Sequence, residues 1–278
     1  MKYKFWIKLV IFSLLILTVL SCQSQMVSNS SDKTKSDVPA NKGNGASQTK
    51  SEIPAPRDIK FTSAETVEIV GTFYESPKAD SPAVLLLHQF GSSRHSFDEF
   101  AKRLQKDGFG VLAIDGRGFG DSTKTTDGKT VAAERTAESV KGMEADVSNA
   151  VDFLAKQRNI DAAKIGIVGA SYGSSLALIY AAANKQMKNV ALLSQGINYF
   201  DNLPTIPAIK NYGNRPLLLV AAEDNKESAD AVRKLKEAGA NEKYEVKIYE
   251  EGGHGTAIFD AGVGLQDLLE QFLTKSLQ

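Results

Sequence analysis

A serine stands at the centre of the segment Gly169–Gly173, which reads G-x-S-x-G. The apolar run Ile165–Val168 before it is typical of a buried strand, and the alanine-rich stretch after it favours a helix. A sharp turn between strand and helix strains the backbone at the serine and lifts its hydroxyl above the sheet. The amide groups that begin the following helix then face the same point. This placement predicts that Ser171 is a nucleophile.

Polar residues follow three further apolar runs, at the points where strands are expected to end. These groups are His88–Gly91 after the run 83–87, Glu223–Asn225 after the run 217–222, and Gly253–Gly255 after the run 244–249. Ligands of parallel sheets bind beyond the carboxyl ends of the strands, so these groups are expected near Ser171. A serine, an acid and a histidine in one place can serve as nucleophile, orienting carboxylate and base.

Alternating strands and helices must position these residues. Strands are expected at 59–62, 67–73, 83–88, 109–114, 165–170, 190–194, 217–222 and 244–249, and helices at 96–107, 136–157, 174–183, 230–238 and 258–273. This order predicts an α/β fold with a mostly parallel central sheet and helices on both faces. The segment 195–215 is only about 20 residues long, which leaves no room for a large lid, so we expect an open site with little or no lid.

The chain resembles an α/β-hydrolase over about residues 60–275, nearest to the dienelactone-hydrolase-like and serine-esterase branches. The resemblance rests on four elements that are specific in combination: His88–Gly91, the glycine-rich loop Asp115–Ser122, Gly169–Gly173 and Gly253–Gly255. The order of serine, then acid, then histidine along the chain is the order of that fold. The resemblance implies the α/β-hydrolase fold, a catalytic triad and no cofactor.

The resemblance makes Ser171 the nucleophile and His254 the base. A serine hydroxyl is nearly inert at neutral pH and needs a base within hydrogen-bond reach. The glycines on both sides of His254 suit a tight loop from which an imidazole can reach the serine. Of the other two histidines, we expect His88 to be structural, at the start of the oxyanion loop, and His95 to lie at the surface or at the start of a helix.

The oxyanion hole is expected to use the backbone amides of Phe90 and Tyr172. Gln89 stands where the family commonly has glycine, and its side chain either adds a polar contact or points to solvent. In the loop 115–122 the aspartates are expected to be structural, and Arg117 is expected to hold the loop by pairing with a carboxylate.

The acid position has three candidates in Glu223, Asp224 and Asn225. Counting from Ala222, at the strand end, puts the acid at Asn225, whereas counting from Ala221 puts it at Asp224, and we favour Asp224. An asparagine there would orient the histidine without stabilising the imidazolium. The charged residues from Lys226 to Glu237 predict an ordinary solvated helix face.

The amino terminus resembles a bacterial lipoprotein signal. Lysines at 2, 4 and 8 flank the start of the apolar stretch Ile7–Leu20, which is short for a membrane-spanning helix. Val19–Cys22 resembles a lipobox, which makes Cys22 the lipidated residue. We therefore expect a signal peptide at 1–21, a disordered tether at 22–56 and an α/β-hydrolase domain at 57–278. The resemblance to lipoprotein signals places the protein in the bacterial cell envelope, at the outer membrane rather than the inner one, since Gln23 is not an aspartate.

Composition narrows the class of function. The 278 residues include 33 basic and 33 acidic side chains, so charge gives no reason to expect nucleic acid as a partner. The motifs of metal sites, P-loops and dinucleotide-binding turns are missing from the sequence. We expect a serine hydrolase that cleaves esters of small or medium acyl substrates. The alternatives are an acyl-peptide or thioester hydrolase with the same triad, and an inactive domain that serves as an envelope binding module.

Overall fold

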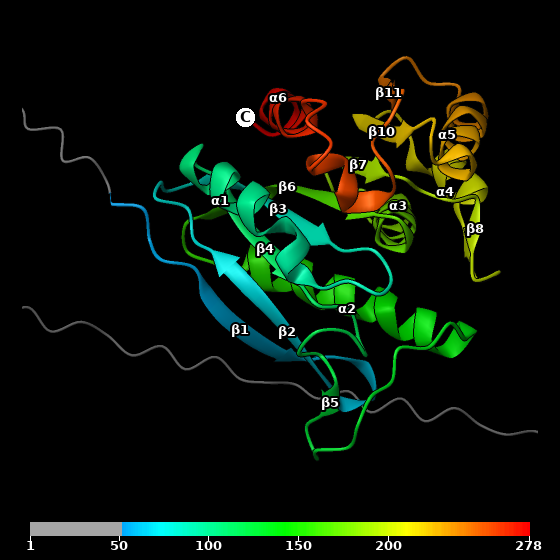
Figure 1. Cartoon of the computed structure of the whole chain (residues 1–278). Coiled ribbons are helices and arrows are strands. Elements are labelled where there is room, and N and C mark those ends of the chain that lie inside the picture. The colour runs from blue at the N-terminus through cyan, green and yellow to red at the C-terminus, as the bar shows by residue number, and fades with distance from the viewer. Residues whose placement is uncertain (1–51) are drawn as a thin grey trace, which may run out of the picture. The chain divides into compact units, whose positions relative to one another are not determined.

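The computed structural model describes residues 52–278, and the predicted signal peptide, Cys22 and nearly all of the predicted tether lie outside the described residues. Nine strands form one sheet in the order β1-β2-β4-β3-β6-β7-β10-β11, with β5 paired to β2 (Figure 1). Their bounds are β1 Arg57–Thr62, β2 Val67–Tyr74, β3 Ser81–Leu87, β4 Gly110–Ile114, β5 Lys124–Thr125, β6 Ile160–Ala170, β7 Asn189–Leu193, β10 Leu217–Ala222 and β11 Tyr244–Tyr249. The strands from β4 to β11 in this order pair in parallel, and β2 pairs antiparallel with its neighbours.

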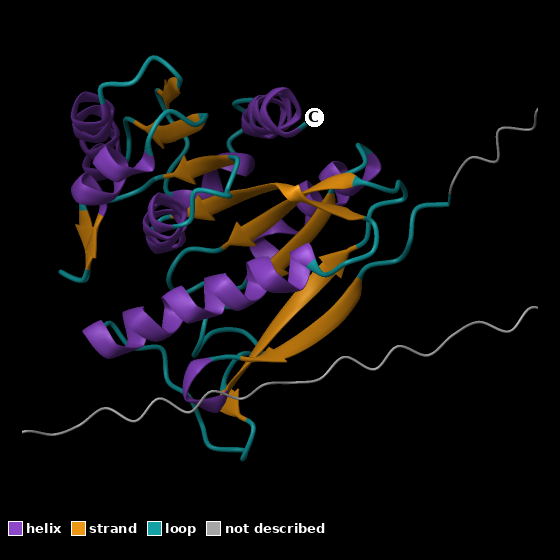
Figure 2. Ribbon diagram, turned by 180° about the vertical axis from the view of Figure 1, so that it is seen from behind, coloured by secondary structure: helices purple, strands orange, loops and turns teal. Residues whose placement is uncertain are grey.

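Helices cover both faces of this sheet. One face carries α2 (Ala137–Ala155), α3 (Tyr172–Ala183), α4 (Thr205–Tyr212) and α5 (Lys226–Gly239), whose apolar residues share one core cluster. The other face carries α1 (Asp98–Lys106) and α6 (Leu265–Leu277) over a second cluster. Helix α1 lies in front of the strands in Figure 1, and α2 lies in front of them in the view from behind (Figure 2). The central strands are buried on both sides, which explains their continuous apolar runs.

The predicted α/β architecture is confirmed, and several details differ. Helix α5 begins at Lys226 rather than at 230, and strand β6 begins at Ile160 rather than at 165. The closing helix does not begin at Ile258, because Gly255–Phe259 forms a 3-10 helix instead. Helix α6 begins at Leu265, directly after Gly264, whose φ of 77° is left-handed. The segment 195–215 holds a small helix, α4, and a short ribbon of β8 (Asn198–Tyr199) and β9 (Leu203–Pro204). Within residues 52–278, every helix is too short or too polar to cross a membrane.

Candidate active site

Ser171 occupies a strained turn between β6 and α3. Its φ of 54° and ψ of −121° are rare for a residue with a side chain, and such strain is typical of functional turns. A β-carbon on Gly169 would lie 2.3 Å from the carbonyl oxygen of Gly173, and one on Gly173 would lie 2.6 Å from that of Leu87. The Ser171 amide donates to the carbonyl of Leu193 on β7 at 2.7 Å, which fixes the turn to the neighbouring strand.

His254 lies in the loop after β11, and two side chains hold that loop over the sheet. The Gly255 amide donates to Ser194 Oγ at 2.9 Å, at the end of β7. The Thr256 hydroxyl donates to Gln89 Oε1 at 2.9 Å, so the Gln89 side chain makes a polar contact rather than pointing to solvent. These bonds bring the histidine loop to the edge of the sheet that carries Ser171.

The His254 imidazole is half-buried and poised to be neutral. Its Nδ1 is buried without a hydrogen-bond partner in the described part of the chain. Burial lowers the pKa of His254, and the nearby negative charge of Glu227 acts in the opposite direction. No hydrogen bond joins His254 to Ser171 among residues 52–278. Catalytic hydrogen bonds are often long before substrate binds, and a neutral imidazole is the form that can accept a proton.

The three candidates for the acid have separate partners. Asp224 accepts the amides of Gly252 and Gly253, each at 3.0 Å, and these bonds hold the pKa of its carboxyl below the usual range. Glu223 pairs with Arg233 at the surface. The Asn225 side chain accepts the amide of Ser228 at 3.2 Å and caps α5. Within residues 52–278 no carboxylate oxygen lies within 4 Å of an imidazole nitrogen of His254, so Asp224 contacts the histidine's loop and not its ring.

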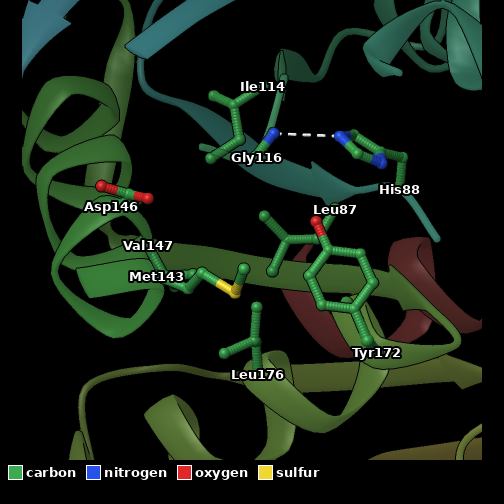
Figure 3. Close-up of a pocket in the computed structure, with 10 residues that line it drawn as sticks. Leu87, His88, Ile114, Gly116, Met143, Asp146, Val147, Tyr172 and Leu176 are labelled. Carbon is green, nitrogen blue, oxygen red and sulfur yellow. Dashed lines mark hydrogen bonds between the residues drawn. The ribbon is translucent and has the colours of Figure 1, made fainter. Parts of the chain in front are cut away.

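His88 has a structural position beneath the oxyanion loop. Its Nε2 accepts the amide of Gly116 at 2.9 Å, as Figure 3 shows, and its Nδ1 lies 2.7 Å from the carbonyl of Gln89. A ring that accepts at Nε2 must carry its proton on Nδ1, which donates to that carbonyl. Burial lowers the pKa of His88, so the neutral ring ties the oxyanion loop to the loop after β4.

The residues of the predicted oxyanion hole are neighbours. The rings of Phe90 and Tyr172 have centroids 5.8 Å apart, and Phe119 and Phe200 pack against Phe90 at 4.8 and 5.1 Å. Tyr172 is the first residue of α3, so its amide has no acceptor within the helix. The guanidinium of Arg135 lies over the Phe90 ring at 4.4 Å and closes one side of this aromatic cluster.

A buried ion pair supports the oxyanion loop, and the sequence held no pattern that marked it. The guanidinium of Arg94 pairs with Asp115, and the Arg94 amide donates to the same carboxylate at 2.7 Å. The Asp121 amide donates to the Asp115 carboxylate at 2.9 Å, and the Asp121 carboxylate pairs with Arg94 at 2.8 Å. Arg117 pairs with Asp146 at 2.8 Å, in agreement with its predicted partner type. These aspartates are structural.

Two hollows lie near the candidate site residues, and they differ in volume. The hollow lined by His88, Gly116, Met143 and Tyr172 holds about 20 Å³, which is space for about one water molecule (Figure 3). The second hollow, between residues 196–199 and α5, holds about 300 Å³ and opens beside Tyr199. Of these two hollows, only the second is large enough to hold more than a water molecule. Within the described residues, His, Cys, Asp and Glu side chains form no group of three that could hold a metal ion.

A mostly parallel sheet, helices on both faces and a serine at a strained turn after β6 together define the α/β-hydrolase fold. Residues 82–206 match the family described as alpha/beta hydrolase fold.

Comparisons with known proteins agree with this fold. An uncharacterised protein of Mycobacterium tuberculosis is 25% identical over 239 residues, which are 80% of this chain and 80% of that protein. An esterase of Pyrococcus furiosus superposes with a TM-score of 0.65 at 18% identity, over 81% of this chain and 92% of the esterase. A dienelactone hydrolase from Anabaena variabilis superposes with a TM-score of 0.61 at 18% identity, over 80% of this chain and 99% of that enzyme.

Proposed function

We propose that the protein is a serine hydrolase that cleaves carboxylic esters of small or medium acyl substrates through an acyl-enzyme. The observation that carries the proposal is the strained turn at Ser171, which close glycine contacts shape and which is followed at once by the Tyr172 amide at the start of α3. The fold is shared with an esterase and a dienelactone hydrolase, which supports the same class of reaction.

The reaction proceeds in two halves. Ser171 Oγ attacks the ester carbonyl carbon while the His254 imidazole takes its proton, and the amides of Phe90 and Tyr172 bind the oxyanion. The C–O bond to the alcohol then breaks, and the imidazolium returns the proton to the leaving oxygen. Water attacks the acyl-enzyme with the same base, which releases the acid and restores the serine. Asp224 supports His254 by accepting the amides of Gly252 and Gly253, which holds the loop that carries the imidazole.

The proposal is tested by labelling the full chain with a fluorophosphonate and locating the adduct by peptide mass spectrometry. We expect an adduct on Ser171 that is absent from Ser171→Ala and strongly slowed in His254→Ala. A chromogenic ester should then give a burst of one alcohol per enzyme. A folded protein that takes no adduct would instead favour the binding module.

We also propose that the mature protein is anchored in the bacterial envelope through a lipid on Cys22. The support for this is the lipobox-like Val19–Cys22 after a short apolar stretch. Metabolic labelling with a palmitate analogue tests it, since Cys22→Ala should lose both the label and the membrane fraction.

A further inference from the structure

The hollow of about 300 Å³ beside Tyr199 has two unlike walls. Gly196, Ile197, Asn198 and Tyr199 form one wall, and Glu227, Asp230, Ala231 and Lys234 of α5 form the other. Its volume is at the lower end of the range for small-molecule sites, so it suits one compact group of a substrate.

This hollow adjoins the reacting groups from both walls. The Tyr199 hydroxyl donates to the carbonyl of Ser194 at 2.9 Å, and the Ser194 hydroxyl accepts the amide of Gly255, next to His254, at 2.9 Å. Glu227, on the other wall, is close enough to His254 for its charge to act on the imidazole. A group bound between Tyr199 and Glu227 would therefore belong to a substrate whose ester lies at Ser171.

The charges of the hollow are unevenly placed. Asp230 is occupied by Lys226 at 2.7 Å and by Arg233 at 3.3 Å. Glu227 differs, because no Lys, Arg or His nitrogen of residues 52–278 lies within 4 Å of its carboxylate. Lys234 comes seven residues after Glu227, which places it about 10 Å further along the helix. The wall formed by α5 thus has a negative charge at Glu227 that no ion pair of the described residues compensates.

We propose that this hollow binds a positively charged group of the substrate, with Glu227 as its counter-ion and the Tyr199 ring as its aromatic wall. The proposal rests on the proposed ester hydrolysis and names its substrate class as esters that carry a protonated amine or a quaternary ammonium. Such cations are attracted both by carboxylates and by the faces of aromatic rings. Glu227 and Tyr199 are then specificity-determining residues. Glu227 is exposed, so its contribution is modest and sensitive to salt.

A pair of matched esters tests the proposal. 2-(Trimethylammonio)ethyl butyrate and 3,3-dimethylbutyl butyrate have nearly the same shape and differ in one positive charge. The readout is the ratio of kcat/KM for the cationic ester to kcat/KM for the neutral one. Glu227→Gln should lower this ratio about three- to tenfold at low salt and less at 1 M salt. Lys234→Gln should raise it.

Glu237→Gln is the matched control, because it makes the same charge change on the same helix outside the hollow. We expect it to leave the ratio at the wild-type value. An unchanged ratio in Glu227→Gln would overturn the proposal, and so would an equal loss of kcat for both esters, since that pattern assigns Glu227 to the imidazole. Turnover of the neutral ester in either case leaves the proposed hydrolase standing. Failure to turn over either ester, without an adduct on Ser171, removes both proposals.

Discussion

Replacing Arg94 with methionine should destabilise the domain by about 3–5 kcal/mol, because it leaves a buried carboxylate without its charged partner. The Arg94 side chain is 3% exposed, and that of Asp115 is 0% exposed. Asp115 would keep two neutral donors, the amides of residue 94 and of Asp121, at 2.7 and 2.9 Å. These donors solvate the charge without balancing it, so the cost approaches that of a broken buried pair.

Urea unfolding followed by circular dichroism measures this cost. The control is Arg103→Met, which removes the pairs with Asp267, at 2.6 Å, and with Glu270 from a side chain that is 38% exposed. Because these pairs are open to solvent, the change should cost at most about 1 kcal/mol. The double variant Arg94→Met with Asp115→Asn removes both charges, so its cost should be smaller than the sum of the single variants. In thermal unfolding, 3 kcal/mol corresponds to a fall in Tm of roughly 6–12 °C for a domain of this size.

Two results would refute the reasoning. One is an Arg94→Met variant that is no less stable than Arg103→Met. The other is a double variant whose cost equals the sum of the single costs to within about 0.5 kcal/mol, which would mean that the two side chains do not interact.

Further predictions concern the reacting groups. Gly173→Ala would place a β-carbon 2.6 Å from the carbonyl oxygens of Leu87 and His88, so fluorophosphonate labelling of Ser171 should slow more than about tenfold at equal folded fraction, and an unchanged rate would count against the turn as drawn. Asp224→Asn should lower kcat by about ten- to a hundredfold, because it weakens the bonds that hold the loop of His254 in place. Asn225→Ala should cost about 1 kcal/mol of stability through the lost cap and little activity. The reverse pattern would make Asn225 the residue that supports the base. Burial lowers the pKa of His254 from 6.5, so kcat/KM should rise with pH through a midpoint below 6.5 as the imidazole loses its proton, and a midpoint above 6.5 would contradict this.

The sheet and the turn at Ser171 were predictable because their signals are local. β3 and β10 are continuous apolar runs, and each is buried along its whole length. The G-x-S-x-G pattern spans five residues, and its two glycines allow a close backbone contact within that span, which the structure shows between Gly169 and Gly173. The small helix α4 was not predicted, and its Pro207 lies in the first turn, where proline is tolerated.

The acid and the supporting ion pair could not be predicted because they depend on contacts between distant segments. Counting along the chain left Asp224 and Asn225 one residue apart, and only the packing shows that Asn225 caps a helix while Asp224 meets the histidine loop. Arg94 contacts Asp115 across 21 residues, and an arginine in a polar stretch gives no sign that it will be buried. Glu227 likewise lies in a run of charged residues, and nothing in that run indicates that its charge acts on the His254 imidazole.

The bond between Gln89 and Thr256 has a consequence for how the site tolerates change. It joins the loop that carries Phe90 to the loop that carries His254, two segments separated by 167 residues. A disturbance of either loop is therefore transmitted to the other, and the oxyanion amide and the base lose alignment together. Substitutions on the two loops should then be less harmful in combination than their separate effects suggest, so the site can accumulate paired changes that neither loop would tolerate if the loops were independent.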